Sequence, residues 1–143
     1  MDPNFAVTAL AKTPLFAHAS ASTLQTVASN LRRRRFRRNE VIFHQGDPGD
    51  SLHIVAAGAV KIVLPSAEGE EAIIATLREG DFFGELSLLD GGPRSATVVA
   101  RGAVVCFALR RAVFAKLLRA EPAIAIAIMT ELAGRVRQTE ATP

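Results

Sequence analysis

The chain has 143 residues, enough for one domain with a hydrophobic core, and its 49% hydrophobic and 22% charged residues are typical of a globular protein. No apolar run approaches the roughly 18 residues of a membrane-spanning helix, and the start lacks the basic cluster of a signal peptide. The one cysteine, Cys106, excludes an internal disulfide and a four-cysteine metal site. We therefore expect no membrane contact, a reducing cytoplasmic compartment and a buried Cys106.

The first part of the chain has the residue spacing of helices. Ser20 or Ser22 is suited to cap a helix, because a hydroxyl can accept from the free N–H groups of its first turn. The apolar residues of this helix recur at intervals of three and four, as on one helical face: Leu24, Val27, Ala28 and Leu31. We assign residues 1–35 to a helical N-terminus.

Basic charge is concentrated in Arg32–Arg35 and Arg37–Arg38, although the formal net charge is only +3. Such a run can bind the phosphates of a nucleic acid. It is also typical of an exposed strand whose long, solvated side chains resist pairing at the edge of a sheet. We favour the strand, because no recognition helix is visible beside the run.

From residue 36 the pattern changes to short strands separated by turns rich in Gly, Pro and Asp. The predicted strands are Val41–Phe43, Ser51–Ala56, Ala59–Leu64, Ala72–Leu77, Thr97–Ala100 and Ala103–Leu109. Short strands with turn signals about every 8–12 residues favour a barrel or sandwich over alternating βαβ units. We assign residues 36–109 to a β-barrel.

Two helices are predicted over residues 110–139. The first has its apolar residues on one face, and Pro122 lies where the first turn of the second helix tolerates a proline. The second helix is apolar on more than one face, through Ile124, Ile128, Leu132 and Val136. We expect this last helix to pack on the barrel and to pair with a second copy of the chain; packing within one chain is the alternative.

The segment from Phe83 to Val98 has the features of an anion site. Gly84 leaves room for a close ligand, and the turn Leu86–Leu89 offers free N–H groups at its start. The planar guanidinium of Arg94 is suited to phosphate oxygens. Glu85 would repel a phosphate, so it fits a ligand that also carries a sugar hydroxyl. An ion pair between Glu85 and Arg94 that merely closes the loop is the alternative, and the chemistry alone leaves both open.

From about Pro14 to Gln138 the chain resembles the cyclic nucleotide-binding domain of bacterial catabolite activator (cAMP receptor) proteins, kinase regulatory subunits and nucleotide-gated channels. Its phosphate-binding cassette is matched on both sides of a short spacer, by Phe83-Gly84-Glu85-Leu86-Ser87-Leu88 and by Pro93-Arg94-Ser95-Ala96-Thr97-Val98. The effector domain of the bacterial activators is the most similar type. The resemblance implies a mainly β fold with flanking helices: an antiparallel β-roll or jelly-roll barrel with N-terminal helices and two C-terminal helices, in one domain over residues 1–143.

The resemblance also implies roles for single residues. Glu85 would accept a hydrogen bond from the ribose 2′-hydroxyl, and Arg94 would pair with the cyclic phosphate. The backbone N–H groups of Gly84, Leu86, Ser95 and Ala96 would complete the phosphate cradle, and Phe83 and Ser87 would also belong to the ligand site. The base would be lined by Ile62, Ile74, Ala75 and Leu77 and closed over by Arg135 and Thr139 of the last helix. Ser95 is the residue of cAMP-responsive bacterial members, whereas Glu140 departs from their small hydroxyl residue.

We predict a receptor that binds cAMP in preference to cGMP and signals by moving its C-terminal helices. One alternative is the effector and dimerisation part of a DNA-binding transcription regulator; another is a dimerising domain of the same fold with no ligand. No helix-turn-helix reader follows the last helix, so we expect a stand-alone domain that does not bind nucleic acid by itself. His18, His44 and His53 lack metal-ligand spacing, and no arrangement indicates nucleophilic catalysis. We therefore expect no metal, no cofactor besides the nucleotide, and no enzyme activity.

Overall fold

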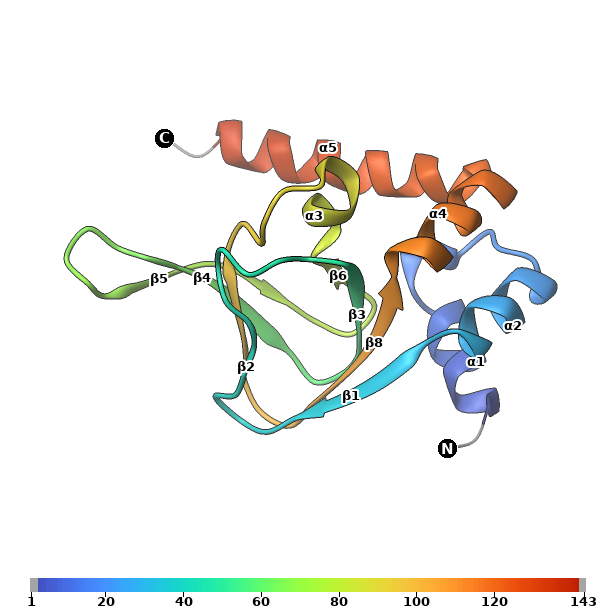
Figure 1. Cartoon of the computed structure of the whole chain (residues 1–143), viewed down its shortest axis with the longest axis horizontal. Coiled ribbons are helices and arrows are strands. Elements are labelled where there is room, and N and C mark those ends of the chain that lie inside the picture. The colour runs from blue at the N-terminus through green and yellow to red at the C-terminus, as the bar shows by residue number, and fades with distance from the viewer. Residues whose placement is uncertain (1–2, 142–143) are drawn as a thin grey trace.

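The structure is a computed structural model that describes residues 3–141, with the side chains of residues 5–138. Eight strands of this part of the chain form two four-stranded antiparallel sheets that face each other (Figure 1). The first sheet has the order β1 (Arg32–Phe36), β8 (Val104–Arg110), β3 (Ser51–Ala57) and β6 (Phe82–Phe83). The second has the order β2 (Val41–Phe43), β7 (Thr97–Ala100), β4 (Val60–Pro65) and β5 (Glu71–Leu77). The predicted mainly β fold with flanking helices is confirmed.

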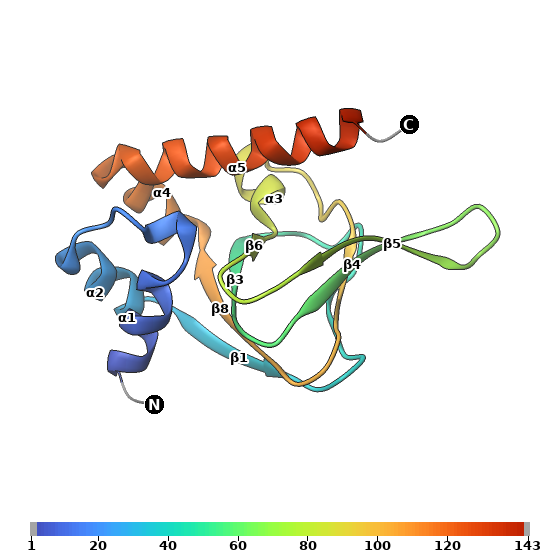
Figure 2. The ribbon, with the colours of Figure 1, turned by 180° about the vertical axis from the view of Figure 1, so that it is seen from behind.

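The helices pack against one side of the barrel. They are α1 (Pro3–Ala11), a 3₁₀ turn (Pro14–Phe16), α2 (Ala21–Ser29), α3 (Glu85–Asp90), α4 (Arg111–Ala120) and α5 (Pro122–Ala141). Seen from behind, α5 runs along the molecule past α3, while α1 and α2 lie beside α4 at one end (Figure 2). The Ser20 side chain accepts from the N–H of Thr23 at 3.1 Å, so Ser20 caps α2. No helix of residues 3–141 is long and apolar enough to span a membrane.

Two hydrophobic clusters follow from the alternation of side chains along the strands. One fills the barrel between the sheets and includes Val55, Val60, Val98 and the fully buried Cys106. The other joins the opposite face of the first sheet to the helices, and includes the following residues: Leu52, Ile54, Phe107, Leu109, Phe114, Ile124 and Ile128. The second cluster fixes α5 against the barrel, and so positions the helix beside α3.

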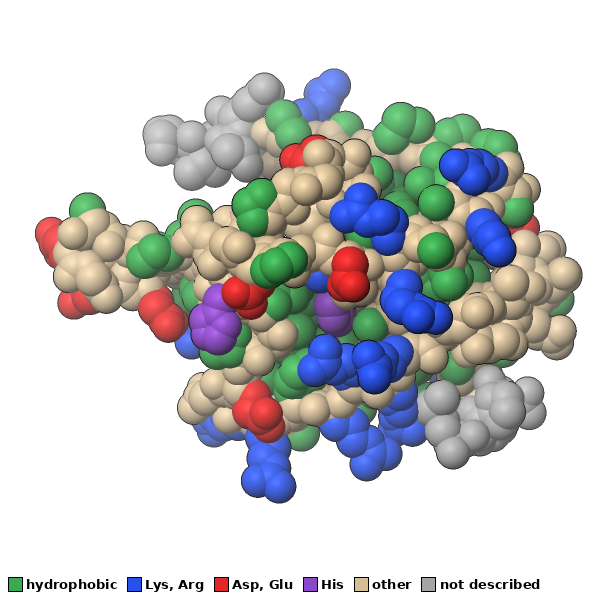
Figure 3. All heavy atoms as spheres, viewed as in Figure 1, with side chains coloured by type: hydrophobic (Ala, Val, Ile, Leu, Met, Phe, Trp, Pro, Cys, Tyr) green, Lys and Arg blue, Asp and Glu red, His purple; other side chains and the backbone are tan. Residues whose placement is uncertain are grey.

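The helical N-terminus is shorter than predicted, because strand β1 begins at Arg32 instead of following residue 35. β1 pairs with β8 from Arg32 opposite Ala108 to Phe36 opposite Val104. Phe36 is buried, which anchors the strand, while Arg32, Arg34 and Arg35 are exposed. The strand interpretation is therefore confirmed for Arg32–Arg35, whereas Arg37 and Arg38 lie beyond the end of the strand. Figure 3 shows Lys and Arg side chains gathered on the side of the molecule where Figure 1 places β1.

One buried histidine should make the fold sensitive to acid. The His53 ring on β3 is 3% exposed and stacks on Phe83 with 5.1 Å between ring centroids. Burial, with smaller contributions from the positive charges of Arg94 and Arg34, lowers the pKa of His53 from 6.5 to about 3. The unfolded chain therefore binds a proton between pH 6.5 and 3 that the folded chain does not, so stability falls as the pH falls through this range.

We expect His53 to account for a loss of about 2 kcal/mol in the free energy of unfolding between pH 7 and pH 5, at about 1.4 kcal/mol for each pH unit below its unfolded pKa. Urea unfolding at the two pH values measures this loss. His53→Phe keeps an aromatic ring and should abolish this pH-dependent loss of stability. The exposed His44, replaced by Gln, is the control and should leave the loss unchanged. An equal loss in His53→Phe would contradict the assignment.

Candidate functional site

The site begins where β6 turns into α3. Gly84 makes this turn with φ 84° and ψ 8°, in the left-handed region that glycine adopts without strain. A Cβ at this position would lie 2.6 Å from Nη1 of Arg94 and 3.2 Å from the backbone oxygen of Ser51. Glycine is therefore needed for both the backbone angle and the space.

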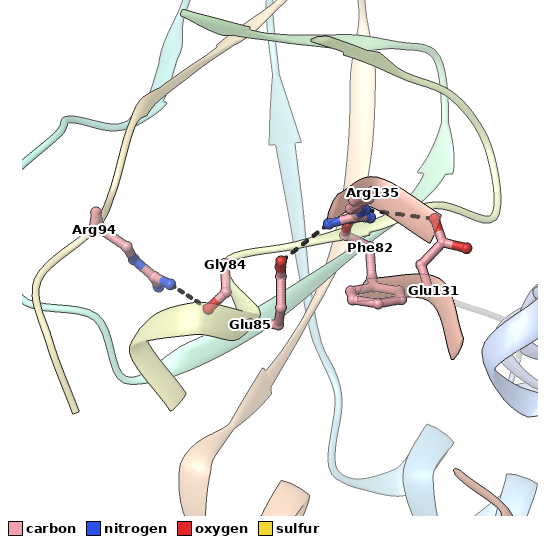
Figure 4. Close-up of polar contacts among 6 residues, drawn as sticks. All are labelled: Phe82, Gly84, Glu85, Arg94, Glu131 and Arg135. Carbon is pink, nitrogen blue, oxygen red and sulfur yellow. Dashed lines mark hydrogen bonds and ion pairs between the residues drawn. The ribbon is translucent and has the colours of Figure 1, made fainter. Parts of the chain in front are cut away.

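Arg94 reaches back from the loop that follows α3 and lies beneath this turn, 5% exposed. Its Nη1 donates to the Gly84 oxygen at 2.9 Å (Figure 4). Its Nη2 donates to the Ser51 oxygen at 3.0 Å. Its Nε is buried and has no hydrogen-bond partner among the described residues. Burial lowers the pKa of Arg94, and the carboxylates of Asp50, Asp47 and Glu85 oppose that shift from a distance.

Glu85 pairs with Arg135 of α5 and not with Arg94. The Arg135 Nη1 lies 3.0 Å from Oε1 of Glu85, and its Nη2 donates to the Phe82 oxygen at 2.8 Å (Figure 4). Glu131, one turn earlier on α5, lies 3.4 Å from the Nε of Arg135. The alternative interpretation, in which Glu85 and Arg94 form an ion pair that closes the loop, is therefore wrong. Instead, Glu85 links the cassette to the last helix.

Gly84, Glu85, Arg94 and Arg135 line one small pocket, whose cavity volume of about 60 Å³ lies well below the roughly 300–1,000 Å³ of typical ligand sites. Most of the predicted site residues line it: Ile62, Phe83, Gly84, Glu85, Leu86, Ser87, Arg94, Ser95, Ala96 and Arg135. The buried guanidinium and the carboxylate of Glu85 both belong to its wall. Such a wall suits a ligand that carries an anion at one end and a hydroxyl donor at the other.

The structure does not bring every predicted base-pocket residue to this wall. Ile74, Ala75 and Leu77 of β5 are not among the residues that line the pocket. Ile74 is 55% exposed on the edge strand, and Leu77 is 9% exposed and packs inside the barrel. Their contact with a base stays a prediction. Thr139 lies on α5, but its side chain and that of Glu140 are outside the described residues.

Three residues of the site were missed from the sequence. Phe43 lines the pocket with its ring 4.1 Å from the Cζ of Arg94. Ser51 supplies both its oxygen and its hydroxyl to Arg94, at 3.0 and 3.3 Å. A Cβ on Gly49 would lie 2.8 Å from the Arg94 Nε, so this glycine makes room for the guanidinium. These residues come from the strands and turn before the cassette, and no spacing in the sequence connects them to it.

Comparison with known proteins identifies the family of this chain. The sequence model of the family described as "Cyclic nucleotide-binding domain" matches residues 33–121. The cyclic AMP receptor protein of Thermus thermophilus is 36% identical over 127 residues, which are 89% of this chain and 59% of that protein. The cAMP-dependent protein kinase regulatory subunit of Candida albicans is 38% identical over 104 residues, which are 73% of this chain and 22% of that protein.

The likeness extends to solved structures. The crystal structure of the Thermus thermophilus catabolite activator protein matches with a TM-score of 0.82 and 36% identity, over 90% of this chain and 60% of that one. This chain thus corresponds to one part of each of these longer relatives. The matched residues 33–121 make up most of the chain and contain the whole cassette from Phe83 to Val98. The chain belongs to the cyclic nucleotide-binding domain family.

Proposed function

We propose that this chain is a cAMP sensor that binds its ligand without turning it over. The observation that carries the proposal is the buried Arg94, whose guanidinium is held only by neutral oxygens while its Nε lacks a partner. A buried charge without a counter-ion is costly, and a phosphate in the pocket would supply one. The cyclic phosphate would bind Arg94, and the ribose 2′-hydroxyl would donate to Glu85.

The contact between Glu85 and Arg135 suggests how binding would be signalled. A hydroxyl that donates to Glu85 would share this carboxylate with Arg135, which lies on α5. The free energy of binding would then shift the position of α5. In a longer regulator, the same shift would reach whatever follows this helix. The preference for cAMP over cGMP rests on Ser95, the residue found in cAMP-responsive bacterial members.

Calorimetric titration with cAMP and cGMP, side by side, tests the proposal. We expect saturable binding of cAMP and weaker binding of cGMP. Adenosine is the control: because it lacks the phosphate, it should bind far more weakly than cAMP. Equal affinity for adenosine and cAMP would show that the phosphate, and therefore Arg94, does not contribute to binding. Absence of cAMP binding would overturn the proposed function.

We also propose that α5 pairs with α5 of a second copy. Ile126, Met129 and Val136 are 59%, 60% and 56% exposed, and their spacing places them on one face of the helix. We expect a dimer in sedimentation experiments, and a monomer for Met129→Glu, because a charge would be buried in the interface. Gln25→Glu adds the same charge to the exposed face of α2 and should leave the dimer intact. A monomeric wild-type protein would contradict the pairing.

A further inference from the structure

Three aromatic rings from three strands form a cluster beneath Arg94. The Phe43 ring of β2 lies 5.7 Å from the His53 ring of β3 and 5.7 Å from the Phe83 ring of β6, between ring centroids. The His53 and Phe83 rings stack at 5.1 Å with 14° between their planes. Phe43 therefore packs against the stacked His53 and Phe83 rings, and it also contacts the guanidinium, with 4.1 Å from its ring centroid to the Arg94 Cζ.

The second observation is that Arg94 has no direct anionic partner. None of the ion pairs among the described residues includes it, and its hydrogen bonds go to Gly84 and Ser51. A cation over the face of an aromatic ring is stabilised by the negative charge density of that face, and most strongly where water is excluded. The ring of Phe43 thus supplies part of the electrostatic stabilisation that a carboxylate would give the Arg94 cation.

A carboxylate at this place would have a different consequence. It would take the free N–H groups of the guanidinium as hydrogen-bond donors and would then compete with an incoming phosphate. An aromatic face attracts the cation but accepts no hydrogen bonds from the N–H groups, which lie in the plane of the guanidinium. The neutral His53 ring next to Phe43 adds no second positive charge, since its pKa of about 3 keeps it unprotonated at neutral pH.

We propose that Phe43 is a positioning residue for phosphate recognition: its ring holds the Arg94 guanidinium in the pocket while leaving a donor free for the ligand. The inference rests on the proposed function, since it names the residue that prepares the same site for the anion. It predicts that an aromatic ring is required at position 43, and not merely an apolar side chain of similar size.

The test compares Phe43→Leu, which keeps an apolar side chain, with Phe43→Tyr, which keeps the ring. We expect about a tenfold loss of cAMP affinity in Phe43→Leu, the size of effect that a partly buried cation–π contact can supply, and less than a twofold change in Phe43→Tyr. Thermal unfolding without ligand checks that each variant is folded. If Phe43→Leu does not fold, Phe43→Met provides a flexible apolar side chain for the same comparison.

A second readout does not depend on ligand. The Nε–H proton of Arg94 lies near an aromatic ring and out of water, so its NMR signal should be shifted and slow to exchange in the wild type and in Phe43→Tyr. The signal is assigned by its loss in Arg94→Lys, and it should move to the ordinary position in Phe43→Leu.

The outcomes separate the two proposals. If the wild type does not bind cAMP, the proposed function fails, while an Nε–H signal shifted only in proteins with a ring at position 43 would still support the role of Phe43 in holding Arg94. If the wild type binds cAMP and Phe43→Leu binds equally well, the inference is overturned although the function stands. Equal losses in Phe43→Leu and Phe43→Tyr would also overturn it, because the ring would then not be the cause.

Discussion

Arg94→Ala should weaken cAMP binding by about 2–5 kcal/mol, the range for removing one partner of a buried, hydrogen-bonded charge pair. Arg94 is 5% exposed and lies in the pocket wall, so its removal would leave the bound phosphate without its cation in a site with little access to water. Calorimetric titration with cAMP measures the loss. Arg78→Ala, at an exposed arginine away from the pocket, removes the same charge and should bind like the wild type.

Arg94→Lys separates charge from geometry. Lysine keeps the positive charge but cannot reach the oxygens of Gly84 and Ser51 with a planar fork, so its affinity should lie between those of the wild type and Arg94→Ala. Both variants lose the hydrogen bonds that hold the turn at Gly84, and thermal unfolding will show whether the fold survives. A folded Arg94→Ala protein with wild-type affinity would contradict the phosphate-binding role.

The cassette could be predicted from the sequence because its parts are close together along the chain. Gly84, Glu85 and Arg94 lie within a short segment, and the motif on each side of the spacer indicates a single phosphate site. The fold class could also be predicted, because the short strands separated by turns and the helical spacing of apolar residues are local signals. The end of the helical N-terminus could not, because the arginine run indicates a strand but its starting residue is set by pairing with β8, 70 to 76 residues later.

The partners of the site residues could not be predicted, since they depend on contacts between distant segments. Arg135 reaches Glu85 across 50 residues, so the sequence left Arg94 as the apparent partner of that carboxylate. The positions of the predicted base-pocket residues on β5 could not be predicted for a second reason. The pairing of β4 with β5 shifts its register between Ile62 and Val63, and a one-residue shift exchanges the two faces of a strand. Simple alternation along β5 therefore could not place Ile74 or Leu77.

Gly84→Ala should lose most cAMP binding while remaining folded. Its φ of 84° would cost about 1–2 kcal/mol of unfolding free energy for any residue with a Cβ. The new Cβ would meet the Arg94 Nη1 at 2.6 Å, and that atom is the end of a flexible side chain that can move away. The guanidinium would thus leave the pocket wall and its hydrogen bond to the Gly84 oxygen. We expect a loss of about tenfold to hundredfold in cAMP affinity, measured by calorimetry.

Gly69→Ala provides a matched control, because Gly69 also has φ 84° and nothing lies within 4 Å of the Cβ that would be added. Urea unfolding should show that both alanine variants lose stability, with Gly84→Ala losing at least as much, since its Cβ also approaches the backbone oxygen of Ser51 at 3.2 Å. Only Gly84→Ala should lose cAMP binding. If both variants bind like the wild type, then the guanidinium does not need the space above Gly84. If both lose binding equally, backbone strain is the cause and the close approach between Gly84 and Arg94 plays no part in recognition.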